Sequence, residues 1–490
     1  KITYILLSAC FLLTSCEDFL NRDPDAKVGS GDYFTDEGSL LTYTNGFIQK
    51  YTPSAADLGY GDGYSDIMAT EKSFTFLTNA SWTPDLQSGW SISNWTPIYN
   101  INYFLVHMRE AKGLSEATYN HYEGTARFWR AWFYYDKVQT FGAVPWYDFT
   151  IAASDKEAMM KPRDSREYVM DKVLEDLTFA STYCLSDAKF TKGSALINKW
   201  VALAFKSRVC LFEAAYRRYH NLTGLEITPE ELYREAAKAA KLVIDNSGCS
   251  LNTAAGKKGA YRDLFYSETP LTQEVILAVC ANEKSGIFGE QNWWFNARSY
   301  GLCWSLVRSF VHTYLKQDGT PFTAAADYAV KSFAEEMEGR DLRLEQTVRG
   351  RNFLWDGKTA VADIKNLSLT GYQVIKYTLD ESKYDGGAKN INSIPLIRYA
   401  EVLLNYAEAQ AELGVITDSE WALTVGALRK RAGITGGTET LPTTVDSYLQ
   451  RTFYPDVTSP VLLEIRRERA IELVAEGMRF DDLRRCCLLY

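Results

Sequence analysis

Four glutamates are spaced as a chemical site could be. Glu464, Glu468, Glu472 and Glu476 follow one another at intervals of four residues, so a helix would align them on one face. Carboxylates arranged in this way can bind a hard cation or act as general acid and base. The alternative is a structural network with neighbouring arginines; those nearby are Arg466, Arg467, Arg469, Arg479 and Arg485. Because no histidine or calcium-type loop accompanies the glutamates, we predict the network and no metal site.

A second cluster combines aromatic rings with polar side chains. Its members are Gln291, Asn292, Trp293, Trp294, Arg298, Tyr300 and Trp304. Indole and phenol rings can stack on the apolar C–H faces of sugar rings, while amide and guanidinium groups bind the hydroxyls. We therefore predict that these residues bind a ligand. The competing interpretation is that the tryptophans pack a small core of their own.

Recognisable catalytic and cofactor motifs are missing from the sequence. It contains no nucleophile elbow, zinc-protease helix, phosphate-binding loop or dinucleotide-binding glycine pattern. The four histidines form no metal-ligand pattern, and carboxylate pairs in an acidic chain do not by themselves indicate a glycosidase. We predict that the protein is not an enzyme and needs no cofactor.

The first residues have the pattern of an export signal. The apolar run from Ile5 to Leu13 is too short for a membrane-spanning helix, which needs roughly 20 residues. Leu13-Thr14-Ser15-Cys16 resembles a bacterial lipobox, in which the chain is cut before a cysteine that receives lipid. We expect residues 1–15 to be a signal peptide, Cys16 to carry the lipid anchor and residues 16–35 to form a tether. The alternative is an unmodified cysteine.

The composition narrows the class of partner. A chain with 46% hydrophobic and 23% charged residues is typical of a globular protein. The net charge of -9 argues against nucleic acid, which needs a basic surface. Beyond Cys10 and Cys16 the cysteines form no Cys-x-x-Cys pair, and we interpret most of them as small buried hydrophobic residues.

Helical periodicity dominates the chain on both sides of an irregular middle. Predicted helices in the first half are Glu123–Phe141, Asp164–Ala180, Ala195–Tyr216 and Pro229–Asn246. From about residue 247 to 395 glycines cluster, and strands are predicted at 274–279 and 372–375. Helical order returns at Pro395. We predict a mainly α protein, with a tetratricopeptide-like helical scaffold and an irregular, loop-rich insertion that binds the ligand.

Three segments together resemble the SusD/RagB family of surface nutrient-binding lipoproteins. They are residues 126–146, which begin ARFWRAWFYY, residues 395–409, PLIRYAEVLLNYAEA, and residues 464–485 around the four glutamates. Smaller matches lie at 95–102 and 318–319, so the resemblance spans almost the whole mature chain. Cys486 stands where the family often has Trp, and we expect a truncated or frameshifted C-terminal end.

The resemblance implies an outer-membrane lipoprotein on the extracellular face that binds oligosaccharides and delivers them to a SusC-like TonB-dependent transporter. It implies that Trp82 and Trp90 belong to the ligand platform and that the glutamate motif is structural. Residues 36–246 would form a SusD-like helical region, intertwined with residues 247–490 in one unit. Alternatives are a peptide-binding RagB-like member, an α-helical glycoside hydrolase and a tetratricopeptide scaffold without a small ligand.

Overall fold

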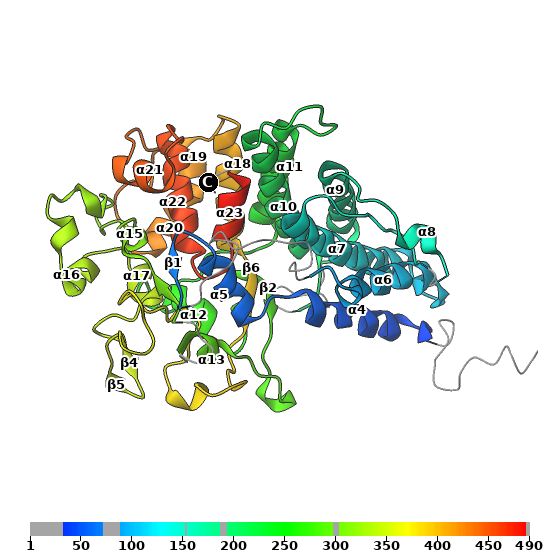
Figure 1. Ribbon diagram of the computed structural model, residues 1–490, viewed down its shortest axis with the longest axis horizontal. Helices are drawn as coiled ribbons and strands as arrows, with labels where there is room; N and C mark the ends of the chain where they lie inside the picture. Colours follow the sequence, from blue (N-terminus) through cyan, green and yellow to red (C-terminus); the bar gives the residue numbers. More distant parts are fainter. Residues whose placement is uncertain are drawn as a thin grey trace, which may run out of the picture.

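The computed structural model describes residues 33–71, 89–151, 154–186, 193, 195–296 and 303–486. Helices dominate it and the strands are few and short, so the mainly α prediction is confirmed. Figure 1 shows the helices of the first half on the right and the loop-rich middle of the chain at the lower left, with the C-terminal helices between them.

The first half is built of helices whose ends follow local capping signals. They are α4 (Glu37–Tyr51), α5 (Ala55–Gly63), α6 (Ile92–His107), α7 (Glu116–Phe141), α8 (Lys156–Met159), α9 (Arg166–Tyr183), α10 (Lys199–Tyr219) and α11 (Pro229–Asn246). Helix α11 has the predicted bounds, because Thr228 caps its N-terminus in a capping box and Pro229 occupies the first turn. Helix α7 begins earlier than predicted, after the cap Ser115, and ends at Gly142, whose φ is +69°.

The middle of the chain holds short elements joined by loops. They are α12 (Ala260–Tyr266), β2 (Val275–Val279), α13 (Gln291–Asn296), β3 (Ser305–Leu306), α15 (Arg308–Val311), α16 (Phe333–Met337), α17 (Arg343–Thr347), β4 (Leu354–Trp355), β5 (Lys358–Thr359) and β6 (Ile394–Arg398). Strand β3 pairs with β1 (Met68–Ala69), β4 pairs with β5, and all three pairs of strands are antiparallel.

Two predictions for this region are wrong. The helix expected from Pro395 starts only at Tyr399, because residues 394–398 pair with β2 as a fully buried strand. The strand expected at 372–375 does not form; Gln373 and Val374 make only isolated bridges to Ser305 and Val348. In both cases pairing across the chain decides the backbone conformation, which local periodicity does not reveal.

The C-terminal helices complete the core. They are α18 (Tyr399–Glu412), α19 (Asp418–Leu423), α20 (Val425–Arg431), α21 (Ser447–Phe453), α22 (Pro460–Glu472) and α23 (Arg479–Arg485). Helix packing continues from α7 to α9, α10, α11, α18 and α22 in turn. One hydrophobic cluster contains side chains from Phe34 to Ala475, so segments far apart in sequence share a core.

The cysteines in the described part of the chain are free thiols. Five are buried, namely Cys184, Cys210, Cys249, Cys303 and Cys486, and Cys280 is half-buried. Burial raises the pKa of the Cys184 and Cys210 thiols to about 12, so both stay neutral. Their interpretation as small buried hydrophobic residues is confirmed.

Candidate ligand-binding site

Helix α13 carries Gln291, Asn292, Trp293 and Trp294 of the predicted cluster and packs against α5, which also contacts α23 (Figure 1). The ring of Trp294 meets Tyr60 edge to face with centroids 6.3 Å apart, and Tyr60 stacks on Tyr64 at 6.0 Å. Tyr64 meets the ring of Phe480 at 5.9 Å. These four half-buried rings, Trp294, Tyr60, Tyr64 and Phe480, form what we call the aromatic row.

The aromatic row includes residues that the sequence analysis missed. Tyr60 and Tyr64 lie four residues apart on α5, so they share a helix face. That spacing was a signal, but three glycines in the same stretch obscured the helix. Phe480 comes from the glutamate motif at the other end of the chain, and no local pattern links it to α13.

Trp293 and Trp294 are half-buried and keep part of their surface accessible. The Trp294 indole N–H donates to the Glu290 carboxylate at 3.1 Å, which orients the ring. The predicted partners Trp82, Arg298 and Tyr300 lie outside the described residues, as does the lipidation site Cys16.

Asn292 has a different environment from its neighbour Trp293. It is fully buried, and its amide oxygen accepts from the Leu379 N–H at 2.8 Å and the Asn390 amide at 2.7 Å. Its amide nitrogen donates to the Leu379 carbonyl at 2.9 Å and the Asp385 carboxylate at 3.1 Å. Because the side chain uses both groups inside the protein, it holds α13 in place and offers nothing to a hydroxyl.

Gln291 and Trp304 are also buried in this structure. The Gln291 amide donates to the Asn392 carbonyl at 2.8 Å. Trp304 meets Tyr60 edge to face at 5.4 Å and lies against α5. A Cβ atom at Gly63 would come within 2.2 Å of its ring, so the close approach requires glycine. For these two residues and Asn292, burial favours the packing role over ligand contact.

Trp90 belongs to another region. Its ring meets Trp95 at 5.1 Å and Phe141 at 4.8 Å, and the Arg163 guanidinium lies 4.6 Å from its centroid. It lines a cavity of about 670 Å³ formed by α6, residues 145–151 and residues 159–163. Trp95, predicted to be a core residue, is half-buried and lines the same cavity. The structure therefore groups Trp90 with α6 and α7.

The four glutamates form the predicted network, and that interpretation is confirmed. Their principal partners, however, are cations from other elements: Arg343, Lys376, Arg398, Arg429 and Arg431. We call these nine residues the buried ion network. Of the arginines named from the sequence, only Arg467 bonds a member of it, Glu464 at 3.2 Å. The others bond Asp66, Glu408, Glu412 and Asp482.

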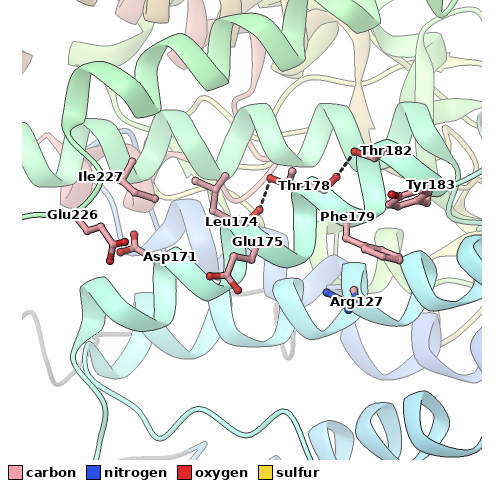
Figure 2. A pocket seen from close by; sticks show the side chains of 10 residues that line it. All are labelled: Arg127, Asp171, Leu174, Glu175, Thr178, Phe179, Thr182, Tyr183, Glu226 and Ile227. Carbon is pink, nitrogen blue, oxygen red and sulfur yellow. Dashed lines mark hydrogen bonds between the residues drawn. The ribbon is translucent and has the colours of Figure 1, made fainter.

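A cavity over α9 differs from the one beside Trp90. It has a volume of about 570 Å³ and is lined by residues of α7, α9 and the loop before α11. Figure 2 shows Asp171 and Glu226 turned toward each other at one end, with Phe179, Tyr183 and Arg127 at the other. Burial raises the pKa of Asp171, although Arg217 bonds its carboxylate at 2.8 Å. The three carboxylates that line it make this cavity unsuited to an anion.

Within the described ranges, no three or more histidine, cysteine, aspartate or glutamate side chains are grouped so that they could hold a metal ion. The same part of the chain contains no helix long and apolar enough to cross a membrane.

Comparisons with known proteins agree with this architecture. Residues 273–488 match the family model described as the SusD family. Residues 18–211 match a model described as starch-binding associating with outer membrane. A SusD-like protein P38 from Formosa agariphila is 26% identical, over 99% of this chain and 90% of the relative.

Solved structures show the same fold. A SusD-like protein from Bacteroides fragilis has a TM-score of 0.70 at 22% identity, covering 95% of this chain and 89% of the other. A SusD-like carbohydrate-binding protein from the same species has a TM-score of 0.71 at 20% identity, over 93% and 87%. Surface glycan-binding protein A from Bacteroides fluxus has a TM-score of 0.62 at 18% identity, over 92% and 89%.

Proposed function

The chain belongs to the SusD family, and from this premise we propose that it binds oligosaccharides without transforming them. The binding surface is formed by Trp293 and the aromatic row. Trp82, Arg298 and Tyr300 stay proposed ligand-binding residues and lie outside the described residues.

One observation carries this proposal. Four half-buried rings from three separate segments contact one another in sequence, and the half-buried Trp293 adjoins Trp294 in the chain. Partly exposed rings give sugar faces a stacking surface, and fixed supports reduce the entropy lost on binding. Asn292, the second residue of α13, and Glu290, just before the helix, provide that support.

The binding test uses a panel of neutral and acidic oligosaccharides, with calorimetry on the soluble protein. We expect Trp294→Ala to weaken binding of the best ligand by about tenfold or more, since stacking on one ring contributes about 0.5–1.5 kcal/mol and the ring also covers the site. Trp200→Ala is the matched control, because Trp200 is half-buried on α10 and lines neither of the cavities described above. Unchanged affinity of Trp293→Ala/Trp294→Ala for the best neutral oligosaccharide would contradict the proposed site.

The same panel separates the rival functions. A peptide library that binds through Trp294 while every oligosaccharide fails would identify a peptide-binding member of the family. Release of new reducing ends from an oligosaccharide during incubation would identify a hydrolase. We expect neither result.

We also propose that lipid on Cys16 holds the protein on the extracellular face of the outer membrane, where it delivers its ligand to a SusC-like TonB-dependent transporter. A family description that names association with the outer membrane supports this location. Cys16→Ala should release the protein from membranes while leaving ligand affinity unchanged. Affinity purification of the lipidated protein should recover the transporter; a membrane-bound Cys16→Ala variant would exclude the anchor.

A further inference from the structure

The cavity beside Trp90 has preformed walls. Asn102, on α6, donates to the carbonyls of Tyr147 and Phe149 at 2.9 and 3.1 Å, which fixes residues 147–149 against the helix. The Tyr147 hydroxyl donates to the Ala158 carbonyl at 2.8 Å and thereby ties the opposite wall to the same segment. A volume of about 670 Å³ lies within the range of small-molecule sites, roughly 300–1,000 Å³.

Aromatic rings cover much of this cavity. Tyr99 and Phe149 remain 46% and 45% exposed, so part of each side chain is open to a ligand. Trp95 and Trp90 lie deeper and are half-buried. Rings at several depths suit a ligand that itself contains flat, apolar ring faces.

In the described part of the chain, the charged side chains that line this cavity are all positive. Among the residues that the structure describes, Lys161 and Arg163 are the only charged ones in this lining, in a protein with 62 acidic side chains and a net charge of -9. Lys161 is already used, since its ammonium group donates to the Trp146 carbonyl at 3.1 Å and pairs with Asp164 at 2.6 Å.

Arg163 is the cation that a ligand can reach. It is exposed and stacks on Trp90, with its guanidinium carbon 4.6 Å from the ring centroid. In the described part of the chain no carboxylate pairs with it. Stacking holds the plane of the guanidinium while its N–H groups remain able to bind a carboxylate or sulfate in bidentate fashion.

We propose that this cavity is a second binding site, for an oligosaccharide that carries an anionic group on its sugar ring. The ring stacks on Tyr99 and Phe149, and its carboxylate or sulfate bonds the Arg163 guanidinium. This site shares no residue with the aromatic row and goes beyond the function proposed for that surface.

The test uses the Trp293→Ala/Trp294→Ala protein, so that the first site does not contribute. Three tetrasaccharides are titrated by calorimetry: tetragalacturonate, a sulfated carrageenan tetrasaccharide and neutral maltotetraose. We expect at least one anionic probe to bind more tightly than maltotetraose, and more weakly as salt is added. The preferred probe tells whether the site selects carboxylate or sulfate.

Variants then locate the binding. Arg163→Gln should weaken the anionic probe by about tenfold or more, as expected for loss of a charged hydrogen-bonded pair. Arg163→Lys should retain part of the affinity, and Tyr99→Ala should lower it by about three- to tenfold. Arg234→Gln, an exposed arginine on α11, removes the same charge elsewhere and should have no effect.

Several results would overturn the proposal. They are failure of both anionic probes to bind, equal affinity in Arg163→Gln and Arg234→Gln, and Arg163-dependent binding of acidic peptides or anionic phospholipid vesicles when the saccharides do not bind. None of them bears on the aromatic row, which is tested separately through Trp294→Ala in the otherwise unchanged protein.

Discussion

The buried ion network and the aromatic row are the two most conspicuous clusters, and the fold treats them in opposite ways. Glu472 is fully buried and bonds Arg343, Arg398 and Arg431, so its charge is satisfied inside the protein. Trp294 is anchored at its N–H and leaves part of its ring accessible. A satisfied cluster stabilises the fold, whereas one with unused binding surface can act on a partner.

Two buried carboxylates, Glu472 and Asp62, differ in how fully they are paired and in the direction of their pKa shifts. The three arginines around Glu472 hold its pKa well below the usual range despite its burial. Asp62, equally buried, accepts from the Arg479 N–H at 2.9 Å with one oxygen, and no cation within the described ranges bonds either oxygen. Burial raises its pKa to about 7. For these two carboxylates, the number of cationic partners decides the direction of the pKa shift.

The largest effect is expected from Glu472→Ala. Removing this carboxylate leaves three buried guanidinium groups short of a partner, which typically costs about 3–5 kcal/mol. Urea unfolding followed by circular dichroism measures the change. Glu175→Ala is the control, since that side chain is 62% exposed and its loss should cost little. Equal midpoints for the two variants would mean that the network does not stabilise the fold.

A somewhat smaller change in the free energy of unfolding, which depends on pH, is expected from Asp62→Asn. The folded pKa of Asp62 is about 7, above its unfolded value of 3.8, so the native state holds the extra proton between these values. Wild-type stability therefore falls, relative to the variant, as pH rises from about 4 to about 7, by up to about 4 kcal/mol. The free energy of unfolding at several pH values measures this difference.

The control for Asp62 has the opposite sign. Asp327 is exposed, and its hydrogen bond with Lys331 lowers its pKa. Asp327→Asn should therefore lose a little stability relative to wild type as pH rises. Parallel pH curves for wild type and Asp62→Asn would contradict the raised pKa.

Asn292→Ala is expected to have an intermediate effect that reaches the ligand surface. It removes three buried hydrogen bonds and one partly buried one and leaves the Leu379 backbone groups unsatisfied, at a cost of about 1–3 kcal/mol. Because α13 loses its support, ligand affinity should fall as well. Measuring stability and affinity together tests this link; unchanged affinity in a destabilised protein would break it.

The smallest loss of stability is expected from Trp294→Ala. The ring is only half-buried, so the free energy of unfolding, measured by thermal unfolding, should fall by about 1 kcal/mol, whereas ligand affinity should fall by tenfold or more. This contrast with Glu472→Ala is the sharpest form of the comparison. A large destabilisation by Trp294→Ala would instead assign the ring to the core.

Sequence patterns correctly predicted those structural features that depend on residues close together in the chain. The bounds of α11 follow from Thr228 and Pro229, which lie beside the helix they start. The strand at Ile394–Arg398 depends on β2, more than a hundred residues earlier, and was mistaken for helix. Likewise the glutamate network was predictable from charge, but its partners come from other elements that only the fold brings near.

The candidate site was harder to predict because neighbours in sequence have opposite roles. Asn292 and Trp293 are adjacent in α13. Because successive residues of a helix point in different directions, Asn292 is buried whereas Trp293 stays half-buried. Residue type indicated that α13 mattered but did not indicate which side chains face outward. Tyr60, Tyr64 and Phe480 join Trp294 only through tertiary packing.

The contact between α5 and α23 has a consequence for biogenesis. Asp62 bonds the backbone of Arg479 across a separation of 417 residues. Synthesis proceeds from the N-terminus, so the contact of α5 with α23, unlike its contact with α13, can form only after almost all of the protein has been made. Contacts of such long range are slow to form, and the open intermediate exposes apolar surface to aggregation. We therefore expect the Tyr64–Phe480 end of the aromatic row to form late in folding.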